Sequence, residues 1–250
     1  MPALPLRRRH GVFQDSRPTR LIATAALQQQ AARRAIGYLK PLVDKMPADA
    51  AALTVLGEAY MADGQPDLAL QQFQKAAALD PDNPTIKTQA GMSEIDIGQP
   101  EQGLATLAQV FGTEAGAPIA GPALVTAELR ARRFDMAAEA AVSLVKRDTK
   151  NPIYHTLLGV VRAAQRDYPG AESAFRAALA INPNLPDATG DLAQVYVATG
   201  RAAEARNLYN DLLSKNPNDV SALLGLADHS RGEVDGSHRR DQPGAHRGAK

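Results

Sequence analysis

Apolar and small residues recur along this chain at helical spacing, in stretches separated by proline and glycine. In residues 50–83 one stretch is "AALTVLGEAYMAD" and the next is "DLALQQFQKAAAL", and in each the apolar side chains lie three or four positions apart. Gly64 follows the first stretch, where glycine readily adopts the left-handed conformation that closes a helix. Pro66 stands where a second helix begins. The pattern predicts two helices joined by a short turn.

The same punctuation returns along most of the chain. A spacing of 34 residues, or a multiple of it, relates Pro47, Pro81, Pro183 and Pro217, and likewise Gly57, Gly91 and Gly159, with Ala193 and Ala227 in step. Such self-similarity indicates stacked supersecondary units. Because one helix pair cannot bury its apolar face alone, the stack supplies the stability.

The repeated pattern resembles the tetratricopeptide repeat. Residues 50–83 carry its markers at Leu53, Leu56, Gly57, Tyr60, Ala69, Phe73, Ala76 and Pro81. Residues 152–185 match at His155, Leu158, Gly159, Ala171, Phe175, Ala178 and Pro183, and residues 186–219 at Leu192, Ala193, Tyr196, Ala205, Tyr209, Leu212 and Pro217. The units at 84–117 and 118–151 keep fewer markers, residues 16–49 form a partial unit, and 220–229 form half a unit. The resemblance implies an all-α fold, a right-handed α-solenoid of antiparallel helix pairs over residues 16–229.

Small residues explain how the paired helices approach each other. Gly57 with Ala69, and Gly159 with Ala171, are expected to face each other, and Phe73 is expected to reach the next unit. In Gly159→Leu the added side chain should overpack this contact. The segment "PIAGP" at 118–122 holds two prolines and a glycine, so helix formation is expected to start only at Pro122. This shortened helix would bend the array or widen the groove.

Composition supports a helical core and removes several chemistries. Aromatic residues make up only 4% of the chain, so alanine and leucine must fill the core, which favours closely packed helices. No cysteine is present, which excludes disulfides, thiolate metal sites and thiol nucleophiles. We find no apolar run typical of a secretion signal or a transmembrane helix.

The charge distribution argues against nucleic acid as a partner. The formal net charge is +1, but residues 1–20 and 230–250 are basic, which leaves the chain between them mildly acidic. An acidic body provides no long-range attraction for a phosphate backbone. We expect residues 1–15 and 230–250 to be disordered tails.

Candidate catalytic and metal-binding residues do not form a site in the sequence. The stretch "ALDPDNP" at 78–84 lacks the central glycine and closing glutamate of a calcium loop, so we interpret it as a turn with Asn83 or Asp82 capping the next helix. His155 lies inside the array and is expected to be a half-buried packing group. His238 and His246 lack a zinc constellation, and no phosphate loop or nucleophile elbow is present. We therefore expect a non-enzymatic protein without a cofactor or metal.

In the resembled family the first helices line a concave groove through repeat positions 2, 5, 9 and 12. The resemblance assigns to this groove Thr54, Glu58, Met61, Thr88, Met92, Ile95, Thr126, Leu129, Thr156, Val160, Ala163, Gln194 and Val197. The Lys and Asn residues that family members use to hold an acidic chaperone terminus are missing. A largely apolar groove suits an extended or helical peptide, with methionines adapting to its shape. The alternative is that these residues only pack on neighbouring first helices.

Residues 128–227 are also similar to the tetratricopeptide lipoproteins of bacterial PEP-CTERM/exosortase systems, found near exopolysaccharide export genes. The segments "NPIYHTLLG", "GAESAFRAALAINP" and "LAQVY" carry this likeness. It implies a scaffold that binds a protein or peptide partner in the bacterial cell envelope or periplasm, and a chain that is a truncated or frame-shifted fragment of a longer protein. Without this likeness we expect a cytoplasmic scaffold. The alternatives are an accessory repeat domain of an enzyme, such as a glycosyltransferase or protease, and a spacer that binds nothing.

Overall fold

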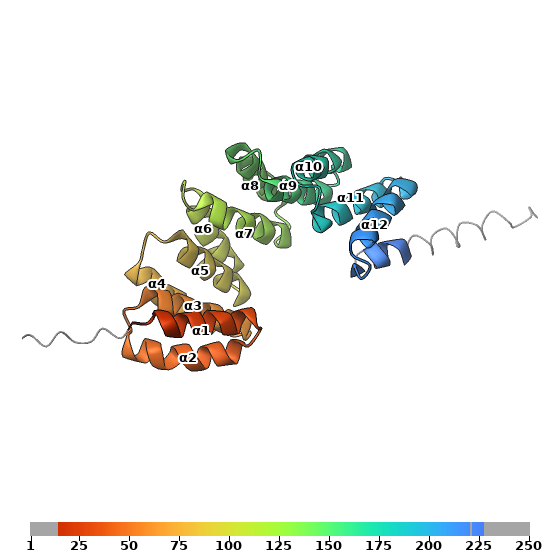
Figure 1. The fold of residues 1–250 in the computed structure, drawn as a ribbon. Coiled ribbons are helices and arrows are strands. Elements are labelled where there is room, and N and C mark those ends of the chain that lie inside the picture. Colours follow the sequence, from red (N-terminus) through yellow and green to blue (C-terminus); the bar gives the residue numbers. More distant parts are fainter. Residues whose placement is uncertain (1–14, 221, 228–250) are drawn as a thin grey trace, which may run out of the picture. The chain divides into compact units, whose positions relative to one another are not determined.

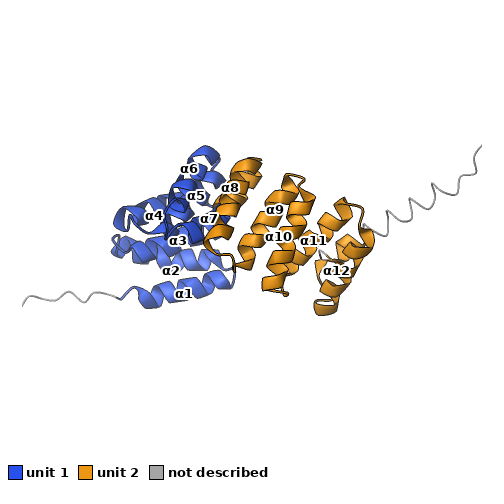
Figure 2. Ribbon diagram, turned by 90° about the horizontal axis from the view of Figure 1, so that it is seen from above, with its two compact units in different colours: residues 1–123 blue, residues 124–250 orange. Residues whose placement is uncertain are grey.

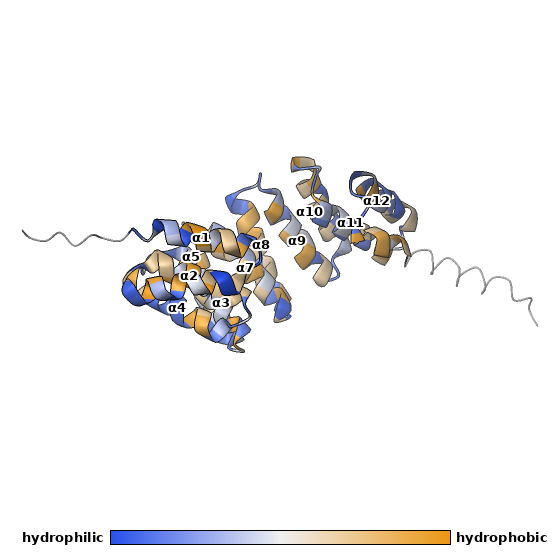
Figure 3. Cartoon of the chain, turned by 60° about the horizontal axis from the view of Figure 1, so that its bottom comes forward, coloured by the Kyte–Doolittle hydropathy of each residue, from blue (hydrophilic) through white to orange (hydrophobic). Residues whose placement is uncertain are grey.

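The computed structural model describes residues 15–220 and 222–227 (Figure 1). Within these residues all regular secondary structure is helical, which confirms the predicted all-α fold class of helix pairs in an α-solenoid. The predicted tails lie outside the described residues, apart from Asp15. Apolar and polar residues share most of the helices (Figure 3), as expected for helices that bury one face.

The chain forms two compact units, residues 1–123 and 124–250, which are coloured separately in Figure 2. The boundary falls within α7 (Ala117–Arg130). Before α7 the helices are α1 (Arg17–Gln28), α2 (Ala32–Lys45), α3 (Ala50–Ala62), α4 (Pro66–Leu79), α5 (Pro84–Asp96) and α6 (Pro100–Phe111). After α7 they are α8 (Phe134–Arg147), α9 (Pro152–Ala164), α10 (Tyr168–Ile181), α11 (Pro186–Ala198) and α12 (Ala202–Lys215), and residues 222–227 are also helical.

The helix starts follow from local sequence. Asn83 caps α5 through its side-chain oxygen, which accepts hydrogen bonds from the backbone N–H groups of Thr85 and Ile86 at 3.1 and 3.3 Å. Asn151 caps α9 in the same way through the N–H of Ile153 at 3.0 Å. In both helices a proline occupies the first position, where no backbone N–H is needed. Asn83 therefore has the capping role that the sequence predicts.

The turn inside each pair contains one residue in the left-handed conformation. These residues recur every 34 positions, with φ of +58° at Gln30, +72° at Gly64, +86° at Gly98, +59° at Arg132, +63° at Arg166 and +77° at Gly200. Glycine adopts this conformation without steric cost, whereas a side chain there costs roughly 1–2 kcal/mol. The repeat geometry thus imposes a glycine conformation on three residues that are not glycine.

Three of the helix pairs close over a glycine. A Cβ atom on Gly57 would lie 2.6 Å from the Phe73 ring, and one on Gly159 would lie 2.6 Å from the Phe175 ring. Both rings are fully buried. The ring of the same unit, rather than the expected Ala69 or Ala171, thus lies nearest to each glycine. In the third pair, α5 and α6 meet backbone to backbone, since a Cβ on Gly103 would lie 2.4 Å from the carbonyl oxygen of Gly91.

The expected late start of the fourth first helix is wrong. α7 begins at Ala117 and contains Pro122, so its first turn includes "PIA". Pro118 stands in the first turn, where backbone N–H groups have no partner within the helix. The helix therefore gives up only the hydrogen bond that the nitrogen of residue 122 would have donated. Because α7 is not shortened, there is no reason to expect that a short helix bends the array or widens the groove.

We expect Gly159→Leu to lower the free energy of unfolding by about 1–3 kcal/mol, because the new side chain has to displace the buried Phe175 ring. Chemical denaturation monitored by circular dichroism measures the change. Gly190 provides a matched control, since a Cβ atom there would meet nothing within 4 Å. Gly190→Ala should stabilise α11 by up to about 1 kcal/mol, whereas Gly159→Ala should not. Equal effects of alanine at the two positions would contradict this packing.

We expect Arg166→Gly to raise the free energy of unfolding by about 0.5–1 kcal/mol. The left-handed strain of Arg166 is relieved, and the greater freedom of glycine in the unfolded chain offsets part of the gain. The same denaturation experiment measures it. Arg162→Gly is the comparison, because Arg162 lies in the last turn of α9, where the backbone is helical, and glycine there should destabilise by up to about 1 kcal/mol.

Candidate functional site

In unit 1 the predicted groove residues lie on the first helices α3 and α5. Thr54, Glu58 and Met61 follow one another at intervals of four and three positions, which places them on one face of α3. Thr88, Met92 and Ile95 have the same spacing on α5. Five of these six side chains are half-buried, and Thr88 is buried. We call these residues the first-helix surface of unit 1, and their counterparts on α7, α9 and α11 the first-helix surface of unit 2.

Three of the four predicted groove threonines direct their hydroxyl groups back into their own helices. The Thr54 hydroxyl donates to the backbone carbonyl of Ala50 at 2.8 Å. The Thr88 hydroxyl donates to the backbone carbonyl of Pro84, also at 2.8 Å. In unit 2 the Thr156 hydroxyl donates to Pro152 at 3.0 Å. Because these donors are already used inside the helix, the threonines offer a partner little polar chemistry.

Part of the unit 1 surface packs against neighbouring first helices. The Ser93 hydroxyl on α5 approaches the sulfur of Met61 on α3 at 3.3 Å, and Met61 also packs against the apolar core. Burial raises the pKa of Glu58, as expected for a carboxylate on a largely apolar surface. Met61 therefore packs on a neighbouring first helix, as the alternative interpretation expects. Glu58 is the one acidic residue among the predicted groove residues.

In unit 2 the predicted residues lie on α7, α9 and α11. Thr126 and Leu129 on α7 are half-buried, as are Thr156, Val160 and Ala163 on α9. Val160 and Ala163 also pack against the core of this unit. Gln194 and Val197 on α11 are the exposed members, and Val197 is 49% exposed. Exposure on the first-helix surface of unit 2 is therefore greatest on α11.

The residue set missed two contributors at repeat position 2. Ile153 is 49% exposed and lies three and seven positions before Thr156 and Val160, on the same face of α9. Asp187 has the corresponding place on α11. Burial, followed by the charge of Asp187, raises the pKa of Asp191 one turn later. The rule of positions 2, 5, 9 and 12 already contained this signal, since position 2 belongs to it.

His155 is half-buried on α9, and its Nε2 donates to the backbone carbonyl of Thr149 at 2.9 Å. This hydrogen bond ties the helix to the preceding turn. Within the described residues, His, Asp and Glu side chains nowhere gather in threes with metal-binding geometry. The described helices are too short or too polar to cross a membrane.

Comparison with known proteins identifies the type of repeat. Two family models, both described as tetratricopeptide repeat, match the chain. One matches residues 60–120 and 162–228, and the other matches residues 20–84 and 123–186. Cellulose synthase operon protein C of Pseudomonas fluorescens is 27% identical over 177 residues. The match covers 66% of this chain but only 14% of that protein.

Solved structures share the fold at low identity. PilW, a type IV pilus biogenesis factor, matches with a TM-score of 0.72 and 18% identity, over 85% of this chain and 99% of PilW. A tetratricopeptide repeat protein from Parabacteroides merdae matches with a TM-score of 0.69 and 15% identity, over 87% of this chain and 86% of that one. Each family model spans about half of the residues and the helix pairs keep the repeat period, so this chain belongs to the tetratricopeptide repeat family.

Proposed function

We propose that this protein is a non-enzymatic scaffold that binds a protein or peptide partner through its first-helix surface. The observation that carries the proposal is the chemistry of this surface in both units. Three of its four threonine hydroxyls are bonded within their own helices, and its remaining side chains are mostly apolar and half-buried. Membership of a repeat family whose proteins bind protein partners supports the same role.

The surface favours a partner that contributes apolar side chains. Met92 and Val160 offer little hydrogen bonding, so affinity has to come from burial of apolar area, at about 25 cal/mol per Å². Methionine adapts to the shape of a partner because its side chain is unbranched and flexible. An amphipathic helix or an extended segment with apolar residues on one side meets these conditions. Glu58 would then lie beside a polar group of the partner.

We place this scaffold in a bacterial envelope pathway of exopolysaccharide export or protein sorting. Two observations support the placement. Residues 128–227 resemble the lipoproteins of PEP-CTERM/exosortase systems, and 66% of the chain aligns with a protein named for a cellulose synthase operon. The scaffold would then work in the periplasm or at the cell envelope.

A second candidate is an accessory repeat domain of a larger enzyme, such as a glycosyltransferase or protease. The chain spans 14% of the length of the curated relative it matches, so repeats of this kind occur within much longer proteins. In that case the first-helix surface would contact another domain of the same polypeptide. The gene that encodes the full polypeptide distinguishes the two candidates, because a catalytic domain in it would favour the second.

We expect Met92→Glu combined with Val160→Glu to abolish partner capture, because each carboxylate would have to be desolvated against an apolar partner. Crosslinked pull-downs from soluble and envelope fractions, identified by mass spectrometry, compare this double variant with the wild type. The control is Gln71→Glu with Ser173→Glu, which adds the same charge at exposed positions of the second helices α4 and α10. Partners that are lost equally in both double variants would speak for a charge effect and against the first-helix surface.

We expect Glu58→Gln to raise the free energy of unfolding near neutral pH. Burial raises the folded-state pKa of Glu58 above its ordinary value. The ionised form therefore destabilises the fold above that pKa, and the penalty disappears as pH falls through it. Denaturation at about pH 7 and about pH 3.5 measures the difference between the variant and the wild type, which should shrink at the lower pH. A gain that is independent of pH would contradict the desolvation of Glu58.

A further inference from the structure

A small pocket in unit 2 lies at the turn that joins α10 to α11, outside the first-helix surface. Its volume is about 220 Å³. The buried side chains of Leu212 and Thr189 form its floor, and exposed residues such as Pro183 and Pro186 stand at its mouth. We call it the Leu185 pocket, because Leu185 forms part of its wall.

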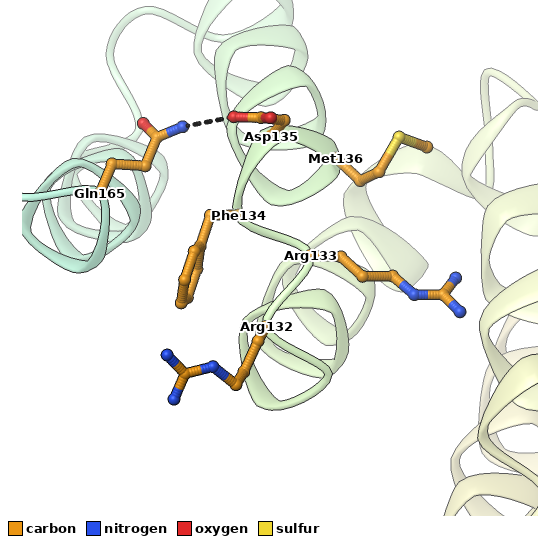
Figure 4. A pocket seen from close by; sticks show the side chains of 6 residues that line it. All are labelled: Arg132, Arg133, Phe134, Asp135, Met136 and Gln165. Atoms are coloured by element: carbon orange, nitrogen blue, oxygen red, sulfur yellow. Dashed lines mark hydrogen bonds between the residues drawn. The ribbon is translucent and has the colours of Figure 1, made fainter.

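The hollow at the turn between α7 and α8 has a different character. Figure 4 shows Phe134 on one side of that turn, with Arg133 and Met136 pointing to the other side. Side chains that point apart do not enclose a ligand. The Leu185 pocket instead has walls from the α10–α11 turn, from the first turn of α11 and from the end of α12 with the turn that follows, so a ligand in it would be contacted from several directions.

Leu185 stands where other units have a polar helix cap. At four other unit boundaries the side chains of Asp49, Asn83, Asn151 and Asp219 each accept a hydrogen bond from a backbone N–H of the following helix. Leu185 forms no such bond at the start of α11. An apolar residue at this position makes the helix less stable, and a local rule is typically broken where a residue has another task. The side chain of Leu185 packs against the core and lines the pocket.

Several hydrogen-bonding groups of the pocket are already used inside the protein. The Thr189 hydroxyl on the floor donates to the backbone carbonyl of Leu185 at 3.0 Å. The Asp219 carboxylate accepts from the backbone N–H of Ala222 at 2.9 Å. The pocket therefore offers a ligand mostly apolar surface, which comes from Pro183, Leu185, Pro186 and Leu212.

One cation stands at the mouth of the pocket. The Nζ of Lys215 lies 3.5 Å from Oδ1 of Asn184, and both residues are exposed and line the pocket. A hydrogen bond of this length is weak, so the ammonium group is free to turn toward a ligand. A cation beside an apolar pocket favours an aromatic ring over an aliphatic side chain, because the face of a ring attracts positive charge.

The size of the pocket limits the ligand to about one ring. An apolar cavity of about 150 Å³ already accepts benzene, whereas pockets for drug-sized molecules start at about 300 Å³. A peptide can present such a ring as a single side chain. Ile181 and Val220 are 41% and 66% exposed and lie within two residues of the lining residues Pro183 and Asp219. They provide apolar surface for the residues on either side of the ring.

We propose that the Leu185 pocket binds one aromatic side chain of a peptide segment. The ring packs against Leu185 and Leu212, and the ammonium group of Lys215 lies over its outer face. A nucleobase fits less well, because the polar groups on its edge would be buried without hydrogen-bond partners. This binding site is additional to the first-helix surface and does not depend on it.

The test uses the fluorescence of the ligand. The chain contains no tryptophan, so tryptophan emission reports only on an added peptide. The full chain is titrated into the capped peptide Ser-Val-Trp-Val-Ser, and we expect the emission to shift to shorter wavelength as the indole leaves water. Peptides with phenylalanine or cyclohexylalanine at the centre then compete. Cyclohexylalanine has nearly the size of phenylalanine but no aromatic face, so we expect it to compete about fivefold less well.

Two variants test the pocket itself. Leu185→Asn introduces the cap of the other unit boundaries and removes part of the wall. We expect it to weaken binding by about tenfold and to melt close to the wild type, because the new cap offsets the lost apolar contact. Lys215→Met keeps an unbranched side chain at an exposed position without its charge, and should remove the preference for phenylalanine over cyclohexylalanine.

Matched controls separate the pocket from general effects. Lys146→Met removes the same charge from the last turn of α8 at an exposed position, and should change the affinity less than about twofold. Met92→Glu with Val160→Glu should leave binding intact, which keeps this proposal separate from the proposed function. Four results overturn the proposal: no emission shift with the wild type, equal competition by the two peptides, unchanged binding by folded Leu185→Asn, or free indole or adenosine binding as tightly as the tryptophan peptide.

Discussion

The close approach of two helices over a glycine is the constraint on which the rest of the structure depends. Gly57 under Phe73 and Gly159 under Phe175 leave no room for a Cβ atom, so the ring fixes both the distance and the register of the pair. In the α5–α6 pair, Gly91 and Gly103 bring the two backbones together instead. Once a pair is closed in this way, the side of the first helix that faces away from the ring is the side left for neighbouring helices and partners.

The period of 34 residues predicts the helix pairs because the glycines that make this contact recur at that spacing. The structure differs from the predicted helices where a local sequence rule competes with the repeat pattern. Proline was read as a helix breaker at 118–122, but a proline in the first turn removes no hydrogen bond, so α7 starts at Ala117. The first helix at 16–49 was only weakly patterned, yet α1 and α2 form a complete pair. Leu21 and Ile22 explain the weak pattern, because they are apolar and nevertheless 70% and 54% exposed.

The sequence predicts which helices carry the candidate residues but not how far each side chain is buried. Repeat arithmetic places Thr88 and Met61 on the first helices, whereas their burial depends on what the next helix brings, such as Ser93 against the sulfur of Met61. The left-handed conformation of Arg132 escaped prediction for a different reason, because it arises in a turn and helical periodicity does not describe turns. Its trace in the sequence is the 34-residue spacing that puts Arg132 in step with Gly64 and Gly98.

In unit 2 the faces of α9 and α11 offer apolar side chains such as Val160 and Val197, which bind without strong directional preference. The Thr156 hydroxyl beside them is used inside its own helix, so it adds little direction to the contact. Selectivity on such a surface therefore has to come from the pattern and spacing of apolar side chains in the partner, which must match the spacing of the first helices.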